Sequence, residues 1–192
     1  MSTAVMTGRI KKTSPHARTA GIFYLLTFVT GMFALQVRSS LGLASGVIAA
    51  GCYIAVTLLF YYIFKPVNRS LSLLAACVSL MGCVIGPVGL FVHAMARINA
   101  LVFFGFYCLL IGYLIFKSTF LPRILGVLMT FAGLGWLTFV SPSLANYLSP
   151  YNMFPGLLGE GMLTLWLLVK GMNVDRWKEQ ASGAEEWRAQ QS

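Results

Sequence analysis

The sequence predicts an all-α, polytopic membrane protein with six transmembrane helices, and three observations indicate this fold class. Hydrophobic residues make up 58% of the 192 residues and charged residues only 10%, whereas a soluble domain carries about 25% charged residues. The apolar residues form runs of about 20, the length that a helix needs to cross the hydrocarbon core. Lysine and arginine lie between these runs. Because irregular backbone cannot face lipid, each run is expected to be helical.

Six apolar runs are predicted to be helices. They extend over residues 20–37, 41–64, 71–92, 98–116, 124–140 and 153–169. Most connections are short, so helices that follow one another in the chain are expected to lie antiparallel and side by side. Segment 141–152 is longer and contains two Ser-Pro pairs, each of which is a turn or helix-start signal. It predicts a short helix across the outer face.

The charges predict the orientation of the chain. Lysine and arginine are retained on the cytoplasmic side of a membrane, and of the 14 in this sequence only Arg38 and Arg97 fall in the predicted outer connections. Both termini are therefore expected in the cytoplasm. The predicted organisation is a basic leader (1–19), the transmembrane bundle (20–170) and a cytoplasmic tail (171–192) that is expected to be solvated and without a specific role.

Two predicted inner helix ends share a pattern that runs from tyrosine to lysine, and a third ends in lysine. The second reads YYIFK up to Lys65, the fourth reads YLIFK up to Lys117, and the sixth ends at Lys170. A tyrosine anchor and a snorkelling lysine suit any inner helix end. A duplicated helical hairpin, as found in some transporters, is the alternative interpretation.

The four cysteines lie inside apolar runs, at Cys52, Cys77, Cys83 and Cys108. None forms a CxxC pair or has a histidine or aspartate at metal-site spacing, so we interpret them as small packing residues. No metal or cofactor is predicted. The basic residues are not clustered on one helix face, which argues against a nucleic-acid partner.

Glu160 is one of only five acidic residues, and it lies near the middle of the sixth predicted helix. An ionised side chain there costs from about 2.5 kcal/mol to over 10 kcal/mol. Three interpretations are open. The carboxyl group ties helices together by hydrogen bonds; it binds or moves a proton, a cation or a small cationic solute; or it lies in an outer vestibule. Gly156, Gly159 and Gly161 leave room for a neighbouring helix or a small cavity beside it.

Possible partners of Glu160 are few. His93 and Arg97 are four residues apart and would share a helix face, although they also suit an outer cap that contacts lipid headgroups. The other candidates are Arg38, Asn99, Tyr53 and Tyr107. The candidate intramembrane polar site is predicted to comprise Glu160, Arg97, His93 and Tyr107.

Three stretches of this sequence resemble a bacterial membrane family. They are FFG at 103–105 with LLIGYLIFKSTFLPRILGVL at 109–128, KPVNRSLSLLA at 65–75, and GE at 159–160 with LWLLVKGMN at 165–173. The family is domain of unknown function 4386, and the resemblance extends over about residues 17–173. It implies a multi-helix protein of the bacterial inner (plasma) membrane, places Glu160 on a family motif and implies no activity. Members usually have a longer segment between the first two helices, and many have histidine where Tyr107 stands.

The expected function is that of a non-enzymatic accessory or regulatory membrane component. Its predicted partners are the lipid bilayer and either a second copy of the chain or another membrane protein. A small transporter or channel that uses Glu160 as a proton or cation site is the alternative. An enzyme acting on a lipid is the weakest class, because the sequence has no G-x-S-x-G, H-E-x-x-H or P-loop motif and no second buried acid for acid–base chemistry.

Overall fold

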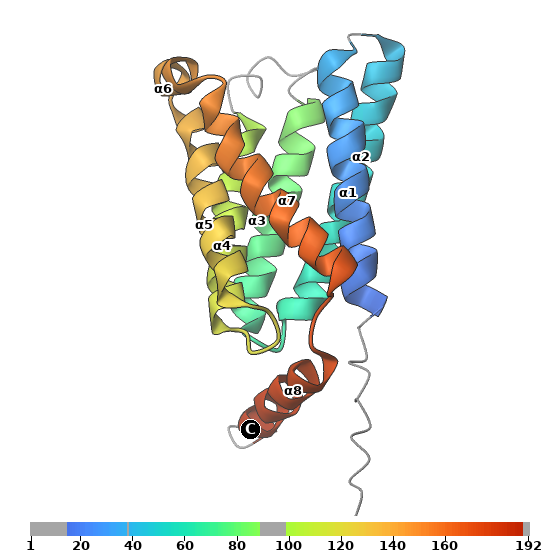
Figure 1. The fold of residues 1–192 in the computed structure, drawn as a ribbon, viewed down its shortest axis with the longest axis vertical. Helices are drawn as coiled ribbons and strands as arrows, with labels where there is room; N and C mark the ends of the chain where they lie inside the picture. The colour runs from blue at the N-terminus through green and yellow to red at the C-terminus, as the bar shows by residue number, and fades with distance from the viewer. Residues whose placement is uncertain (1–14, 38, 89–98, 190–192) are drawn as a thin grey trace, which may run out of the picture.

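The computed structural model describes residues 15–37, 39–88 and 99–189, and the elements found there are helices (Figure 1). The α-helices are α1 (Pro15–Gln36), α2 (Ser40–Phe64), α3 (Arg69–Val88), α4 (Ala100–Lys117), α5 (Arg123–Leu137), α6 (Pro142–Leu148), α7 (Phe154–Val169) and α8 (Val174–Ala189). Two short 3-10 helices, η2 (Thr138–Val140) and η3 (Tyr151–Met153), flank α6. The all-α prediction is confirmed for these residues.

The six predicted long helices correspond to α1, α2, α3, α4, α5 and α7. The bounds of α2 and α7 differ from the prediction by one residue at the N-terminal end, whereas α1 begins five residues before the predicted start at residue 20. The predicted residues 89–92 and 98 lie outside the described part of the chain. The short helix predicted within 141–152 is present as α6, and the Ser141 hydroxyl accepts a hydrogen bond from the Leu144 N–H at its start.

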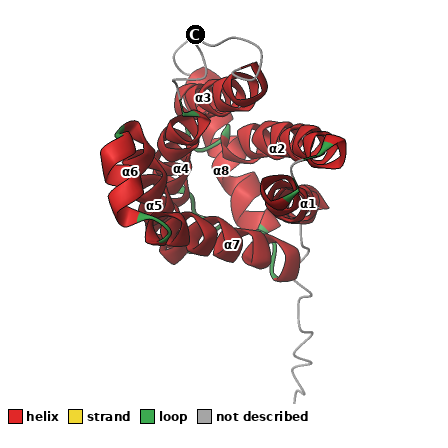
Figure 2. Cartoon of the chain, turned by 90° about the horizontal axis from the view of Figure 1, so that it is seen from above, coloured by secondary structure: helices red, strands yellow, loops and turns green. Residues whose placement is uncertain are grey.

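The six long helices form a closed ring, seen along its axis in Figure 2. Each helix contacts its predecessor in the chain, and α7 contacts both α5 and α1, which completes the circle. Neighbouring helices are antiparallel, so α1, α3 and α5 run towards the end of the bundle that carries α6, and α2, α4 and α7 run towards the end that carries α8 (Figure 1). These two ends are called the α6 end and the α8 end below.

The outer surface of the ring is apolar. Large aliphatic side chains such as Val29, Val47 and Leu134 are more than half exposed, whereas Thr57 and Ser79 are buried inside and share a hydrogen bond of 2.7 Å. Such a distribution suits lipid as the surrounding solvent, because polar groups there must be satisfied within the protein. By length and composition, α1, α2, α4, the segment 123–140 and the segment 151–169 could each cross a membrane, and α3 is apolar but shorter over residues 69–85. The chain is therefore a multi-pass membrane protein.

Two pairs of glycines bring α4 and α5 into backbone contact. A methyl group on Gly112 would come within 3.0 Å of the Gly126 carbonyl oxygen, and one on Gly126 within 2.9 Å of the Gly112 oxygen. Seven residues away on each helix, Gly105 and Gly133 form the second such pair, with corresponding distances of 3.1 and 2.8 Å. Helices in lipid associate through this kind of close approach. Gly133 is therefore a packing contact of α5 with α4.

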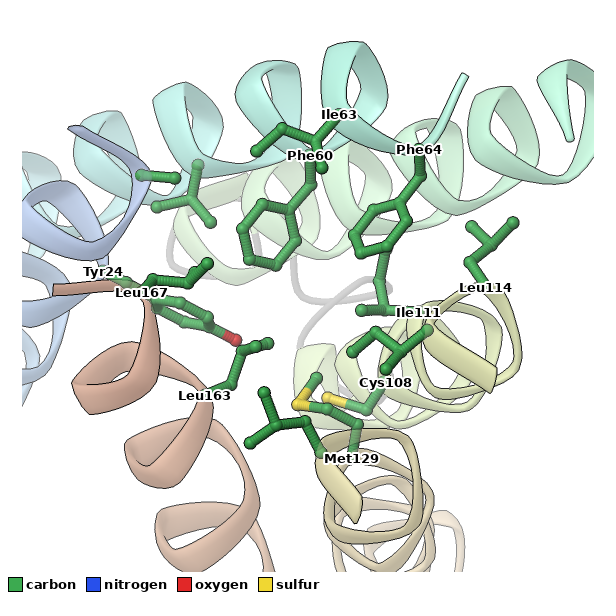
Figure 3. Packing of buried hydrophobic residues seen from close by; sticks show 14 of the residues in the cluster. Tyr24, Phe60, Ile63, Phe64, Cys108, Ile111, Leu114, Met129, Leu163 and Leu167 are labelled. Atoms are coloured by element: carbon green, nitrogen blue, oxygen red, sulfur yellow. The ribbon is translucent and has the colours of Figure 1, made fainter. Parts of the chain in front are cut away.

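Large apolar side chains fill the half of the ring nearer the α8 end. Figure 3 shows Phe60 and Phe64 of α2 facing Ile111 of α4, with Leu163 and Leu167 of α7 completing the layer. All five are at most 2% exposed. These five side chains therefore form a buried apolar layer near the α8 end.

Residues 174–189 of the predicted cytoplasmic tail form α8, which makes specific contacts with the bundle (Figure 1). The Trp177 indole N–H donates to the Ile63 carbonyl oxygen at 2.9 Å. The Gln180 side-chain oxygen accepts from the backbone N–H and the hydroxyl of Thr119, and its amide donates to the Lys117 carbonyl. Because carbonyl groups at the ends of α2 and α4 lack helical partners, α8 supplies the donors that they need.

Three lysines surround the α8 end in similar positions. The Lys65 Nζ lies 5.9 Å from the ring centre of Tyr62, the Lys117 Nζ lies 5.8 Å from that of Tyr113, and the Lys170 Nζ lies 4.5 Å from that of Trp166. Each pair spans about one helical turn at the end of α2, α4 or α7. An aromatic ring and a cation at this level are typical of a membrane–water interface.

Candidate functional site

Glu160 lies in α7 and points into the ring, where it is 5% exposed. Two glycines that precede it in α7, Gly156 and Gly159, allow the neighbouring helix α5 to approach this point. The Trp136 ring occupies the space where a side chain on residue 156 would stand, and the Leu128 carbonyl occupies the space beside Gly159. No atom of a neighbouring helix lies within 4 Å of the place where a side chain on Gly161 would begin. Two of the three glycines therefore make room for a neighbouring helix, as predicted.

Three donors from three other helices surround the Glu160 carboxyl group. The Tyr24 hydroxyl of α1 donates to Oε2 at 2.7 Å, the Trp136 indole N–H of α5 donates to Oε1 at 2.5 Å, and the Cys108 thiol of α4 lies 3.5 Å from Oε1. Figure 3 shows Tyr24 and Cys108 converging on the interior of the ring. The carboxyl group therefore ties four helices together, as the first of the three interpretations expected.

The described polar groups around Glu160 are hydrogen-bond donors, and its carboxyl group is their acceptor. An ionised carboxylate only accepts hydrogen bonds, while tyrosine, tryptophan and cysteine can all donate. The three described partners are also formally neutral. The arrangement thus stabilises negative charge with dipoles rather than with a basic side chain.

Two further tyrosines, Tyr53 and Tyr107, lie beside these groups. Their hydroxyl groups are buried and have no hydrogen-bond partner among the described residues. The Tyr53 ring lies edge-on to that of Tyr24, with 5.7 Å between the ring centres, and 5.9 Å from that of Tyr107. Buried polar groups normally have partners, so each of these hydroxyls has unused capacity for a hydrogen bond.

A groove of about 890 Å3 leads to Glu160 from the α6 side of the bundle. Met153 of η3 and Leu157 and Glu160 of α7 line one side of it, and Glu160 is the innermost of these three. Along α2 the innermost lining residue is Tyr53. The remaining lining residues come from the halves of α1, α2, α3 and α4 nearer the α6 end, from the connection between α1 and α2, and from Trp136. We call this space the Glu160 groove; its walls are almost entirely apolar.

Of the predicted site, the described part of the chain contains only Glu160 and Tyr107. Tyr107 lies in the same buried region, and its hydroxyl has no hydrogen-bond partner among the described residues. Asn99 instead caps α4, accepting a hydrogen bond from the Leu101 N–H. His93, Arg97 and Arg38 lie outside the described residues. In the described part of the chain, no three histidine, cysteine or acidic side chains gather in a way that could hold a metal ion.

The sequence analysis missed Tyr24, Trp136 and Cys108 as partners. All three stand in apolar runs and count as hydrophobic in composition. The free cysteine Cys108 was predicted to be a small packing residue only. Its thiol also faces the Glu160 carboxyl group. A search for every side-chain donor in the apolar runs, rather than for charged residues, would have included all three.

Fold and site together define a multi-pass α-helical membrane protein with a carboxyl group buried between its helices. The chain belongs to the family described as Domain of unknown function (DUF4386), whose sequence model matches residues 38–100 and 91–171. It is also similar to an uncharacterized protein of Archaeoglobus fulgidus, with 25% identity over 127 residues that cover 63% of this chain and 78% of the relative. No solved structure matches the chain. The predicted family resemblance is confirmed.

Proposed function

We propose that the protein spans the membrane six times, with α3 as the sixth span and both termini in the cytoplasm. The ring supports this proposal, since α3 occupies one position in it between α2 and α4. The lysines beside aromatic rings at the α8 end support the orientation, because lysine marks the cytoplasmic side. The location proposed is the bacterial inner (plasma) membrane, which holds helical bundles, whereas outer membranes hold β-barrels.

The role proposed is that of a non-enzymatic accessory or regulatory component that binds a small organic molecule with an apolar body in the Glu160 groove. The groove itself carries this proposal: a volume of about 890 Å3 lies within the range of about 300–1,000 Å3 that small-molecule sites occupy. Its apolar walls with a few convergent polar groups also fit that class of site. Among the described lining residues Glu160 is the only carboxylic acid, and no histidine, lysine or arginine accompanies it, which supports binding over acid–base catalysis.

An accessory role requires a second membrane component. The candidates are another copy of this chain and a different membrane protein. Crosslinking in native membranes, followed by mass spectrometry of the crosslinked species, distinguishes them, and recovery of only the uncrosslinked chain would count against an accessory role.

Transport with Glu160 as a proton or cation site is the second candidate. It is favoured by a buried carboxyl group that lines a groove extending from it towards the α6 end. Transport would also need an opening through the apolar layer at the α8 end. A flux driven by a cation or proton gradient in proteoliposomes, lost in Glu160→Gln, is the result expected for a transporter, and an unchanged flux would exclude Glu160 as its site.

The binding proposal can be tested with 4-phenyl-1-butanol as a neutral probe. The protein is placed in lipid nanodiscs, and the heat of probe binding is measured against empty nanodiscs. Leu101 lines the groove, so Leu101→Trp is expected to weaken binding at least about tenfold by filling the site. Leu134 is 57% exposed on the outside of the ring, so Leu134→Trp is the matched control. Absence of saturable binding, or equal loss in both variants, would overturn the proposal.

A further inference from the structure

We infer that the ligand of the Glu160 groove is an amphiphilic organic cation, with an ammonium group beside Glu160 and an apolar body extending towards the α6 end. This inference rests on the proposed binding function and adds the chemical class of the ligand. Four features of the groove carry it: the free capacity of the carboxyl group, the aromatic rings, the unpaired hydroxyl of Tyr53 and the apolar walls.

The Glu160 carboxylate has room for another donor. A carboxylate offers about four lone-pair sites, and the described residues use two at Oε1 and one at Oε2. A charged N–H donor at Oε2 would form a hydrogen bond about twice as strong as a neutral one. It would also supply the positive charge that the three neutral partners lack.

Aromatic rings stand beside this carboxylate. Tyr53, Phe104 and Trp136 all line the groove, and the ring centres of Tyr53 and Phe104 are 4.8 Å apart. The faces of such rings attract ammonium groups, most strongly where water is excluded. A carboxylate together with aromatic rings therefore favours a cation and disfavours an anion.

The Tyr53 hydroxyl adds a second polar contact. It is buried, has no described partner and belongs to a residue that lines the groove. A phenol oxygen can accept a hydrogen bond from an ammonium group while Glu160 accepts another. A ligand with two or more N–H bonds would thus satisfy both sites from one nitrogen atom.

The rest of the groove selects an organic ion over a metal ion. A hard cation such as Ca²⁺ takes six to eight oxygen ligands, whereas the lining here is dominated by apolar and small residues, including Gly31, Ala34 and Gly46. The small residues leave width for an apolar body. Such a body would contribute through burial, at about 25 cal/mol per Å2 of apolar surface.

The test compares two probes of nearly equal shape, 4-phenylbutylamine and 4-phenyl-1-butanol, on the protein in nanodiscs at neutral pH. The amine is positively charged and the alcohol is neutral. Binding of the amine is expected to be at least about tenfold tighter than binding of the alcohol. In Glu160→Gln this preference should fall to about twofold or less, while the alcohol keeps its affinity. Leu101→Trp should weaken both probes.

A separate variant keeps the test decisive if Glu160→Gln does not fold. Tyr53→Phe removes only the hydroxyl group, and it should reduce the preference for the amine a few-fold without changing the affinity of the alcohol. Equal binding of both probes to the unsubstituted protein, with loss in Leu101→Trp, would overturn the cation inference and leave the binding function standing. Failure of both probes to bind would overturn the binding function and the inference together.

Discussion

The Tyr24 hydroxyl donates a hydrogen bond of 2.7 Å to Oε2 of Glu160, although the two residues are 136 positions apart in the chain. Tyr24 belongs to the first helix of the ring and Glu160 to the last. Their hydrogen bond therefore lies at the junction of α1 and α7 that closes the ring. Both side chains are buried, so the bond is shielded from water.

Removal of the Tyr24 hydroxyl is expected to destabilise the bundle. Tyr24→Phe leaves the ring in place but deletes one of three donors to the carboxyl group, and a lost buried hydrogen bond of this kind costs about 1–3 kcal/mol. The change in unfolding free energy can be measured by denaturant titration in mixed micelles. Tyr113→Phe is the control, because Tyr113 is 47% exposed on the lipid side. Equal stability of the two variants would contradict a role for the Tyr24–Glu160 bond.

Two glycines five residues apart in α7 are expected to respond differently to alanine. In Gly156→Ala the added methyl group would overlap the Trp136 ring, so either the helices separate or the indole leaves Glu160; the expected loss is about 1–3 kcal/mol. In Gly161→Ala nothing lies within 4 Å of the added group, and a gain of about 0.5–1 kcal/mol is expected because glycine is the poorer helix former. Similar thermal unfolding of both variants would argue against close packing of α5 on α7.

Detachment of α8 is expected when its contacts are removed. Trp177→Phe combined with Gln180→Ala deletes the hydrogen bonds to Ile63, Thr119 and Lys117. We expect trypsin to cleave at Lys178 at least about tenfold faster, because local opening controls proteolysis, while the unfolding of the ring stays nearly unchanged. Glu186→Gln, at an exposed site on the same helix, serves as control. Unaltered cleavage would show that these bonds do not hold α8.

Opposite labelling of two serine positions is expected from the proposed orientation. Ser143 is exposed in α6 and Ser182 is exposed in α8. In intact cells, a membrane-impermeant maleimide should modify Ser143→Cys above the background of the unsubstituted chain, and it should modify Ser182→Cys only after the cells are permeabilised. The reverse pattern would place the α8 end outside, and labelling of both without permeabilisation would argue against an even number of spans.

The helices could be predicted from sequence because lipid imposes a simple rule on them. A lysine or arginine near a run marks the point where the chain leaves the hydrocarbon, which fixed the C-terminal end of α2 at Phe64 and that of α7 at Val169. The start of α1 was less predictable. Its first turn continues past the apolar run to Pro15, since proline suits the first helical position whether or not the flanking residues are apolar.

The position of Glu160 could be predicted, but its partners could not. A carboxyl group in mid-helix must face the interior, which the burial of Glu160 bears out. Its donors come from Tyr24, Trp136 and Cys108, which are residue types that also occur in apolar surfaces. Their convergence depends on α7 lying between α1 and α5. This adjacency brings the first and the last long helix of the ring together, and no local sequence pattern predicts it.

The closed ring has a consequence for biogenesis. Tyr24 of α1, Cys108 of α4 and Trp136 of α5 each supply a donor, and their acceptor among the described residues is Glu160 on α7. A nascent chain that stops before α7 would leave an indole, a phenol and a thiol without this acceptor inside an open bundle. Insertion of α7 and satisfaction of these groups therefore coincide, so a chain truncated before α7 is chemically distinguishable to the cell's membrane proteases.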